Sequence, residues 1–277
     1  MSAASKVWFV TGTSSGFGRA IVEEAIARGD RVVATARDPR KLGGLVAVAP
    51  DRVVAVGLDV TRPAELEPAI AAAIRRFGAI DVLVNNAGYS VVGALEETSE
   101  AELRSVLETM FFGAVAMTRA VLPHMRERQR GTIVQITSVG GLTTAPGFGP
   151  YCAAKHALEA VSESLAAEVA PFGVRVLIVE PGAFRTELFG GAFRSLPAMD
   201  VYAASVGPMR AYVADQAGVQ AGDPVKAARA IADAVQAGAP TLRLPLGADA
   251  VQAIRAKLAQ VTADVDRSER IAAATAF

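Results

Sequence analysis

The chain has 277 residues with 28 basic and 28 acidic side chains, so its formal net charge at pH 7 is zero. Because the basic residues are scattered, the sequence shows no charged footprint for nucleic acid. Hydrophobic residues make up 52% of the chain and charged residues 20%, which supplies a large core and excludes a disordered protein.

The first predicted strand is preceded by nothing that resembles a targeting signal. Its apolar run, residues 7–10, is far shorter than the apolar region of a secretory signal, and no run approaches ~18 apolar residues. Cys152 is the only cysteine, which excludes an internal disulfide and fits a reducing compartment. His124 and His156 have no partners at metal-ligand spacing. We therefore expect a cytoplasmic protein without a metal site, a membrane partner or a nucleic-acid partner.

Along the chain, short runs rich in β-branched residues alternate with longer segments of helical spacing. This alternation is typical of stacked βαβ units, and it predicts a parallel sheet with helices on both faces. The seven predicted strands are Val7–Thr11, Arg31–Ala36, Arg52–Leu58, Asp81–Asn85, Thr132–Thr137, Arg175–Glu180 and Thr241–Pro245. The predicted helices are Gly16–Gly29, Pro63–Phe77, Ala101–Arg128, Tyr151–Phe172 and Pro224–Ala237.

Only residues 190–222 break this rhythm. They combine glycines and prolines with aromatic residues and methionines between the sixth strand and the next helix, and we interpret them as a lid over a substrate. No repeat or linker interrupts the alternation elsewhere, so a single domain over residues 1–277 is predicted. Residues 252–277 are predicted to form a helical tail.

A glycine-rich segment follows the first strand directly and opens the first helix. It reads Thr11-Gly12-Thr13-Ser14-Ser15-Gly16-Phe17-Gly18. Backbone amides and a helix N-terminus would converge there, as a pyrophosphate site requires, whereas a simple tight turn is the alternative. The spacing Gly-x-x-x-Gly-x-Gly resembles the cofactor loop of the short-chain dehydrogenase/reductase family. That resemblance implies an α/β fold with a doubly wound, seven-stranded parallel Rossmann-type sheet.

The resemblance extends from the first strand through Thr186 and implies further cofactor contacts. Asp59 and Val60 would contact adenine, Asn86-Ala87-Gly88 would support the cofactor and the central sheet, and Thr186 would hold the nicotinamide carboxamide. Taken alone, each could be ordinary turn chemistry. The full set of expected cofactor-binding residues is Gly12, Ser14, Ser15, Gly16, Phe17, Gly18, Arg37, Asp59, Val60, Asn86, Ala87, Gly88, Tyr151, Lys155, Pro181, Gly182 and Thr186.

The choice of cofactor depends on the end of the second strand, which reads Thr35-Ala36-Arg37-Asp38. A carboxylate there favours the free 2′-hydroxyl of NAD, and an arginine favours a 2′-phosphate. Arg37 therefore favours NADP(H) over NAD(H), while Asp38 keeps NAD(H) open.

Tyr151 and Lys155 are four residues apart at the start of a predicted helix, so they share one face. A nearby cation stabilises a phenolate and lowers the pKa of tyrosine from its usual value of about 10. Such a pair alone is common on surface helices, but Ser138 ends the fifth strand, as in the family. The resemblance implies that Ser138 binds the substrate carbonyl, Tyr151 acts as general acid/base, and Lys155 also binds the nicotinamide ribose.

One position departs from the family pattern. Relatives usually carry an asparagine in the helix after the fourth strand, three residues before a glycine, where it supports a water chain to the catalytic lysine. Gly113 sets the register and places Met110 there, while Asn85 and Asn86 are the only asparagines in the sequence. A thioether donates no hydrogen bond, so the expected relay loses a member.

Three hypotheses therefore stay open. The chain could reduce carbonyls with water or backbone completing the relay. Met110 could instead be a natural or engineered change that lowers turnover or reshapes the pocket. Finally, the chain could be a cofactor-binding scaffold or sensor without redox chemistry, because a fold does not dictate a function.

Apolar residues near the lid predict a bulky, apolar ketone or secondary alcohol as the small-molecule substrate. Ordinary packing of the lid is the alternative for most of the residues considered for the pocket wall, which are Thr143, Phe148, Phe184, Phe189, Phe193, Met199, Tyr202, Met209 and Tyr212. Segments 109–113 and 242–247 also resemble the 17β-hydroxysteroid-type reductases. Family members commonly associate through the helices after the fourth and fifth strands, which implies a homodimer or homotetramer.

Overall fold

The computed structural model describes residues 5–275 and residue 277. Its main strands are β1 (Val7–Val10), β2 (Arg31–Ala36), β3 (Val53–Gly57), β4 (Val82–Asn85), β6 (Gly131–Ile136), β7 (Val174–Pro181) and β9 (Arg243–Leu246). They form one seven-stranded sheet in the order β3-β2-β1-β4-β6-β7-β9, and every neighbouring pair is parallel. This confirms the predicted Rossmann-type sheet, and the strand ends differ from the predicted ones by no more than two residues.

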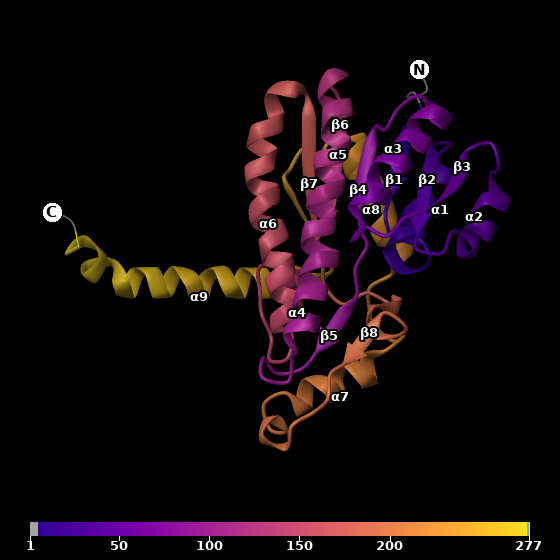
Figure 1. Ribbon diagram of the computed structural model, residues 1–277. Coiled ribbons are helices and arrows are strands. Elements are labelled where there is room, and N and C mark those ends of the chain that lie inside the picture. Colours follow the sequence, from indigo (N-terminus) through magenta and orange to yellow (C-terminus); the bar gives the residue numbers. More distant parts are fainter. Residues whose placement is uncertain (1–4, 276) are drawn as a thin grey trace.

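Helices cover both faces of the sheet (Figure 1). One face packs against α1 (Gly16–Ala27), α2 (Gly43–Val48) and α8 (Pro224–Gln236). The other face packs against α3 (Pro63–Phe77), α5 (Gly113–Glu127) and α6 (Gly149–Val169). Because side chains alternate along a strand, Trp8 and Phe9 of β1 enter opposite core clusters. Both faces of the sheet are therefore buried, which explains the continuous hydrophobic runs of the strands.

The long helix predicted at Ala101–Arg128 is divided into three parts. They are α4 (Glu100–Leu107), a π-helical turn (Glu108–Phe112) and α5. A 3.6-residue apolar period cannot signal this turn, because the π-helix adds only one residue to a single turn. Residues 100–127 are long and apolar enough to cross a membrane by length and composition. The fully buried Met117, Val121 and Met125 nevertheless pack in the core beneath the sheet, as a core helix does.

The 190–222 segment contains more regular structure than its composition predicts. It holds β8 (Phe193–Ser195), which pairs in parallel with β5 (Ser90–Val92), and α7 (Gly207–Gln216). The Glu97 side chain, which is 1% exposed, fixes the segment by accepting hydrogen bonds from Arg210 at 2.7 Å and from the Met199 amide at 2.7 Å. Strands of three residues are too short to leave a periodic signal, so the sequence analysis missed them.

The predicted tail is a single helix, α9 (Ala248–Ala273). It begins against β9 and the short 139–141 turn and then projects away from the rest of the molecule (Figure 1). Leu258, Val265 and Ile271 are 59%, 62% and 73% exposed, so the outer part of α9 presents apolar side chains to solvent.

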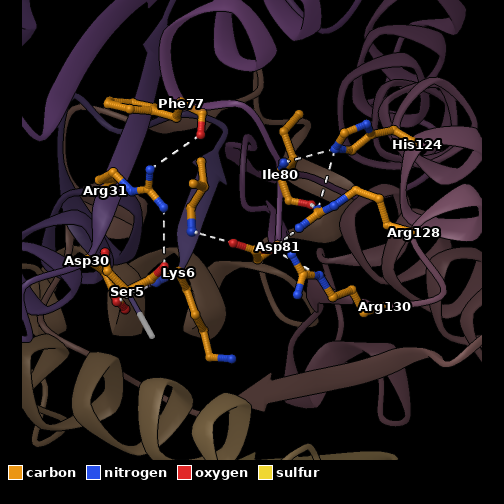
Figure 2. A network of polar contacts seen from close by, with 11 residues as sticks. Ser5, Lys6, Asp30, Arg31, Phe77, Ile80, Asp81, His124, Arg128 and Arg130 are labelled. Carbon is orange, nitrogen blue, oxygen red and sulfur yellow. Dashed lines mark hydrogen bonds and ion pairs between the residues drawn. The ribbon is translucent and has the colours of Figure 1, made fainter. Parts of the chain in front are cut away.

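A polar network connects β1, β4 and α5 at the edge of the sheet where these strands begin (Figure 2). The Asp81 carboxylate accepts hydrogen bonds from the Val7 amide at 2.9 Å and from Arg128 at 2.6 Å. His124 Nε2 accepts one from the Ile80 amide at 3.2 Å. These contacts tie β1 and β4 to the end of α5, at the edge where those strands begin.

Candidate functional site

A cavity of about 660 Å³ opens at the edge where the parallel strands end. Residues that directly follow β1, β2, β3, β4, β6 and β7 all line it, because parallel strands bring their carboxyl ends to one edge. Every predicted catalytic and cofactor-binding residue except Gly18 contributes to the wall. Those residues are Gly12, Ser14, Ser15, Gly16, Phe17, Arg37, Asp59, Val60, Asn86, Ala87, Gly88, Met110, Ser138, Tyr151, Lys155, Pro181, Gly182 and Thr186.

The glycine loop has the conformation that a phosphate cradle needs. Gly12 and Gly16 have φ values of +69° and +56°, a region that favours glycine. A Cβ on Gly18 would collide with the Gly12 carbonyl oxygen and lie 2.5 Å from Asn86 Nδ2. Gly18 therefore lies behind the loop and lets it fold close to α1. The Ser15 side chain does not cap this helix, so the amides of its first turn stay available to an anion.

Asn86 holds the loop in place from the neighbouring strand end. Its Nδ2 donates to the carbonyl oxygens of Thr11 at 2.9 Å and Gly12 at 3.0 Å. The Thr11 hydroxyl accepts in return from the amides of Asn86 at 2.9 Å and Ala87 at 3.1 Å. This clamp positions the loop, and direct contact of Asn86 with a cofactor stays a prediction.

Two cations that follow β2 also line the cavity wall. They are Arg37 and Lys41. Asp38 lies outside the wall, because it caps the turn at Pro39–Leu42 and forms an ion pair with Arg40 at 2.8 Å. The sequence analysis missed Lys41, although a second cation four residues after Arg37 was a usable signal.

Two of the predicted catalytic residues, Ser138 and Tyr151, lie together around Gly140. A Cβ on Gly140 would be 3.3 Å from Tyr151 Cε1 and 3.5 Å from Ser138 Oγ. The Ser138 Oγ accepts a hydrogen bond from the Gly140 amide at 3.0 Å. Lys155 is one helical turn after Tyr151, and its Nζ lies 5.8 Å from the centre of the tyrosine ring.

Burial governs the titration of this group. It raises the pKa of Tyr151 to about 12, although a hydrogen bond with Ser138 opposes the shift. Burial also lowers the pKa of Lys155 to about 8, and the nearby Glu159 opposes that shift. In this structure Lys155 donates to the Ile136 carbonyl oxygen at 2.8 Å and burial dominates the pKa of Tyr151, so a lowering of that pKa by Lys155 stays a prediction.

A buried carboxylate cluster lies behind Lys155 and was not predicted. Glu159, one turn further along α6, and Glu180, near the end of β7, are 3% and 1% exposed. Both form ion pairs with Arg243, the pair to Glu159 at 2.6 Å. Burial raises the pKa of both carboxyl groups. Where Glu159 is ionised, it favours the charged form of Lys155.

Met110 lies in the π-helical turn with a side chain that is 2% exposed. It packs in a small apolar cluster with Tyr151 and Cys152, and a Cβ on Gly88 would be 3.1 Å from its sulfur. A second cavity of about 10 Å³ touches Met110, Asn85 and Lys155. Asn85 Oδ1 is buried and has no hydrogen-bond partner among the described residues. The volume is near the lower limit for one water molecule.

Of the nine residues considered for the pocket wall, Phe184 and Phe189 line the large cavity. The alternative of ordinary packing holds for several of the others, because Phe148, Phe193, Tyr202 and Met209 surround Val92, Ala94 and Val206. Met199 and Tyr212 are 41% and 45% exposed, and Thr143 also lies outside the cavity wall.

Other side chains from the β5–β8 region line the wall instead. The Arg194 guanidinium lies 4.5 Å over the ring of Tyr89 and forms an ion pair with Glu102 at 3.3 Å. The wall residues that were missed at this end are Tyr89, Ser105, Thr109, Leu188, Arg194 and Gln220. The place of Tyr89 and Arg194 depends on the unpredicted strand pair, so the sequence carried no signal for these two.

With this geometry established, residues 6–196 match the sequence model described as short chain dehydrogenase. The chain belongs to the short-chain dehydrogenase family. A short-chain dehydrogenase from Streptomyces avermitilis has a structure that is 50% identical in sequence, with a TM-score of 0.93. That match covers 99% of this chain and 100% of the other.

Curated relatives within the family are oxidoreductases. Oxidoreductase BOA17 of Botryotinia fuckeliana is 38% identical over 228 residues, which are 82% of this chain and 83% of the relative. A 3-ketodihydrosphingosine reductase of Bacteroides thetaiotaomicron is 41% identical over 181 residues, which are 65% of each chain. Solved structures with a similar fold hold NAD in one case and an NADP derivative in another. This short-chain dehydrogenase is therefore an oxidoreductase, and proteins that share its fold bind NAD(P)(H).

Proposed function

We propose that the protein is an NADP(H)-dependent oxidoreductase that interconverts a ketone and a secondary alcohol. The observation that carries this proposal is that Ser138, Tyr151 and Lys155 line the same cavity as the glycine loop. The nicotinamide would supply or accept the hydride when it is bound. The glycine loop fits the pyrophosphate of such a dinucleotide, because Gly12 and Gly16 have positive φ and the first-turn amides of α1 have no side-chain cap.

Each catalytic side chain has a role that its position supports. The Ser138 hydroxyl orients the substrate oxygen, and the Tyr151 phenol donates a proton to that oxygen during reduction or removes it during oxidation. Lys155 holds a positive charge on the same helix face and would bind the ribose hydroxyls of the cofactor. Thr186, whose Cβ would be 3.4 Å from a Cβ on Gly16, would hold the carboxamide.

The preference for NADP(H) is supported by charge at the adenosine end. Arg37 and Lys41 line the wall there, and a 2′-phosphate would pair with both. Asp38, which would suit NAD(H), is already held by Arg40. The proposed substrate is bulky and largely apolar, which the side chains of Phe184, Phe189 and nearby Leu188 support. The similar Bacteroides protein, a 3-ketodihydrosphingosine reductase, supports a long-chain ketone.

A second candidate function is a short-chain dehydrogenase of reduced turnover. The observation that favours it is Met110, which packs against Tyr151 in place of a hydrogen-bonding side chain. A cofactor-binding scaffold without redox chemistry is the third.

The proposal also covers the compartment, the partners and the oligomeric state. We expect a cytoplasmic protein without nucleic-acid or membrane partners, and the single buried Cys152 supports a reducing compartment. A homodimer or homotetramer through α5 and α6 is supported by Phe112 and Val161, which are 52% and 38% exposed beside these helices.

NADPH absorbance with a panel of ketones tests the function. We expect turnover that increases with the apolar size of the ketone. The Tyr151→Phe variant should lose roughly 10²–10⁴-fold in kcat, while its affinity for NADPH measured by fluorescence stays near that of the parent. Binding without turnover on any ketone would overturn the proposal in favour of the scaffold, and small polar ketones as the best substrates would overturn the substrate class.

A further inference from the structure

The outer part of α9 carries an apolar stripe that nothing within the described chain covers. Leu258, Val261 and Val265 are 59%, 44% and 62% exposed, and Val251 and Ile254 are half-buried where the helix leaves the body. The spacing of these five residues is three, four, three and four, which is a heptad pattern over just more than two repeats. Such a stripe marks the contact face of a helix pair.

The exposed length of the helix itself requires an explanation. From Lys257 to Ala273, α9 continues for about 24 Å beyond its contacts with the body. A helix of this length without tertiary packing is marginal in water, because most helical stability in proteins comes from burial of an apolar face. A partner that covers the stripe would supply that burial.

Charges beside the stripe select the partner. Lys257 and Asp264 lie on the same flank of the stripe, seven residues apart. If a second α9 runs antiparallel with the two-fold axis between residues 259 and 260, Leu258 of each helix faces Val261 of the other and Ile254 faces Val265. Lys257 of each helix then lies two residues, about 3 Å along the axis, from the level of Asp264 of the other, so the apolar layers and the charge pairs fit one register.

The charge of the helix argues against a lipid surface as the partner. Residues 248–273 carry four basic and four acidic side chains, so no net positive charge draws α9 to anionic lipid. Figure 1 shows that α9 leaves the body as a separate arm, which gives a second copy room to lie along it.

We infer that α9 is a dimerisation arm, which pairs antiparallel with α9 of a second copy of this chain. Leu258, Val261 and Val265 form its apolar core, and reciprocal Lys257–Asp264 ion pairs set its register. This interface is distinct from the α5–α6 face, and it depends neither on the proposed reaction nor on the cofactor.

Light scattering at tens of micromolar protein tests the core of the arm. The double variant Leu258→Glu plus Val265→Glu should halve the mass of the assembly. The control Ala256→Glu plus Ala263→Glu adds the same charge on the opposite face of α9 and should leave the mass unchanged. Thermal unfolding of both variants checks that the body stays folded. An unchanged mass in the first variant, or a monomeric parent, would overturn the inference.

A charge exchange tests the orientation. Lys257→Glu and Asp264→Lys should each weaken association by about tenfold, because each disrupts two symmetric pairs. The double variant should restore the parent affinity, since only an antiparallel register brings these positions together. Weak association that the double variant does not restore would overturn the register. Sedimentation of the parent with phosphatidylcholine–phosphatidylserine vesicles would overturn the choice of a second copy as partner.

Discussion

The ammonium nitrogen of Lys155 lies 2.8 Å from the carbonyl oxygen of Ile136 at the end of β6. This contact holds the lysine with a backbone acceptor, in a chain where Met110 takes the place expected for asparagine. A cavity of about 10 Å³, which Asn85 also lines, lies beside both residues and has room for at most one water. We therefore expect backbone or water to complete the relay without a side-chain amide at Met110.

The first prediction concerns Met110→Asn. We expect kcat for ketone reduction to change by less than about threefold, because Lys155 already has a backbone partner, while stability falls by about 1–3 kcal/mol as an amide enters an apolar cluster. Stopped-flow rates and urea unfolding measure the two effects. Met110→Leu, which keeps the apolar contact, is the control and should preserve both. A large rise in kcat for the asparagine variant would contradict an intact relay and favour the impaired alternative.

The second prediction concerns cofactor choice. The Arg37→Ala and Lys41→Ala variants should each raise KM for NADPH by roughly 10–100-fold, because each substitution removes a charge-assisted contact with the 2′-phosphate. KM for NADH should change little. Arg40→Ala is the matched control, since Arg40 is 89% exposed and paired with Asp38 outside the cavity. Steady-state kinetics with both cofactors measure the split, and an equal rise for NADH and NADPH would count against the assignment.

The sequence analysis could place residues that follow the long parallel strands, but it could not place those beside the short strands. Motifs that follow the ends of parallel strands must meet at one edge, so Gly12 and Arg37 could be brought to one cavity from their order, while the family resemblance was needed to add Ser138 and Tyr151. Arg194 and Tyr89 could not, because their place depends on two three-residue strands without a periodic signal. The π-helical turn at Met110 was hidden for a similar reason. It adds one residue within an apolar helix and leaves the overall pattern helical.

The third prediction concerns pH. Lys155 has a pKa of about 8 and Tyr151 one of about 12, so both are protonated at neutral pH. Since reduction needs the tyrosine proton and the lysine charge, kcat/KM should be constant below about pH 8 and fall above it as Lys155 loses its proton. In the Glu159→Gln variant the fall should begin at lower pH, because the carboxylate that favours charged Lys155 is gone. A profile that stays flat to pH 10 in the parent would refute this role of Lys155.

The last prediction concerns the polar network at the opposite edge of the sheet (Figure 2). Burial opposes ionisation of Asp81, but hydrogen bonds from Arg128 and the Val7 amide outweigh it and lower the pKa of the carboxyl group below 3.8. A lowered pKa means that the ionised group stabilises the fold above about pH 4, and that this contribution is lost as the pH falls through the folded-state pKa.

Arg128→Met should therefore cost about 2–3 kcal/mol at neutral pH, less than the loss typical of a fully buried pair, because both side chains are about one-fifth exposed. The cost should shrink as the pH falls below about 4, where the free Asp81 carboxyl accepts a proton. Arg130→Met is the control, since Arg130 is 71% exposed and lies 4.0 Å from Asp81, and it should cost less than about 0.5 kcal/mol. Urea unfolding across this pH range measures the differences. Because the network lies at the edge opposite the cavity, kcat should stay at the parent value in both variants, and a cost independent of pH would show that Asp81 is not the group stabilised by Arg128.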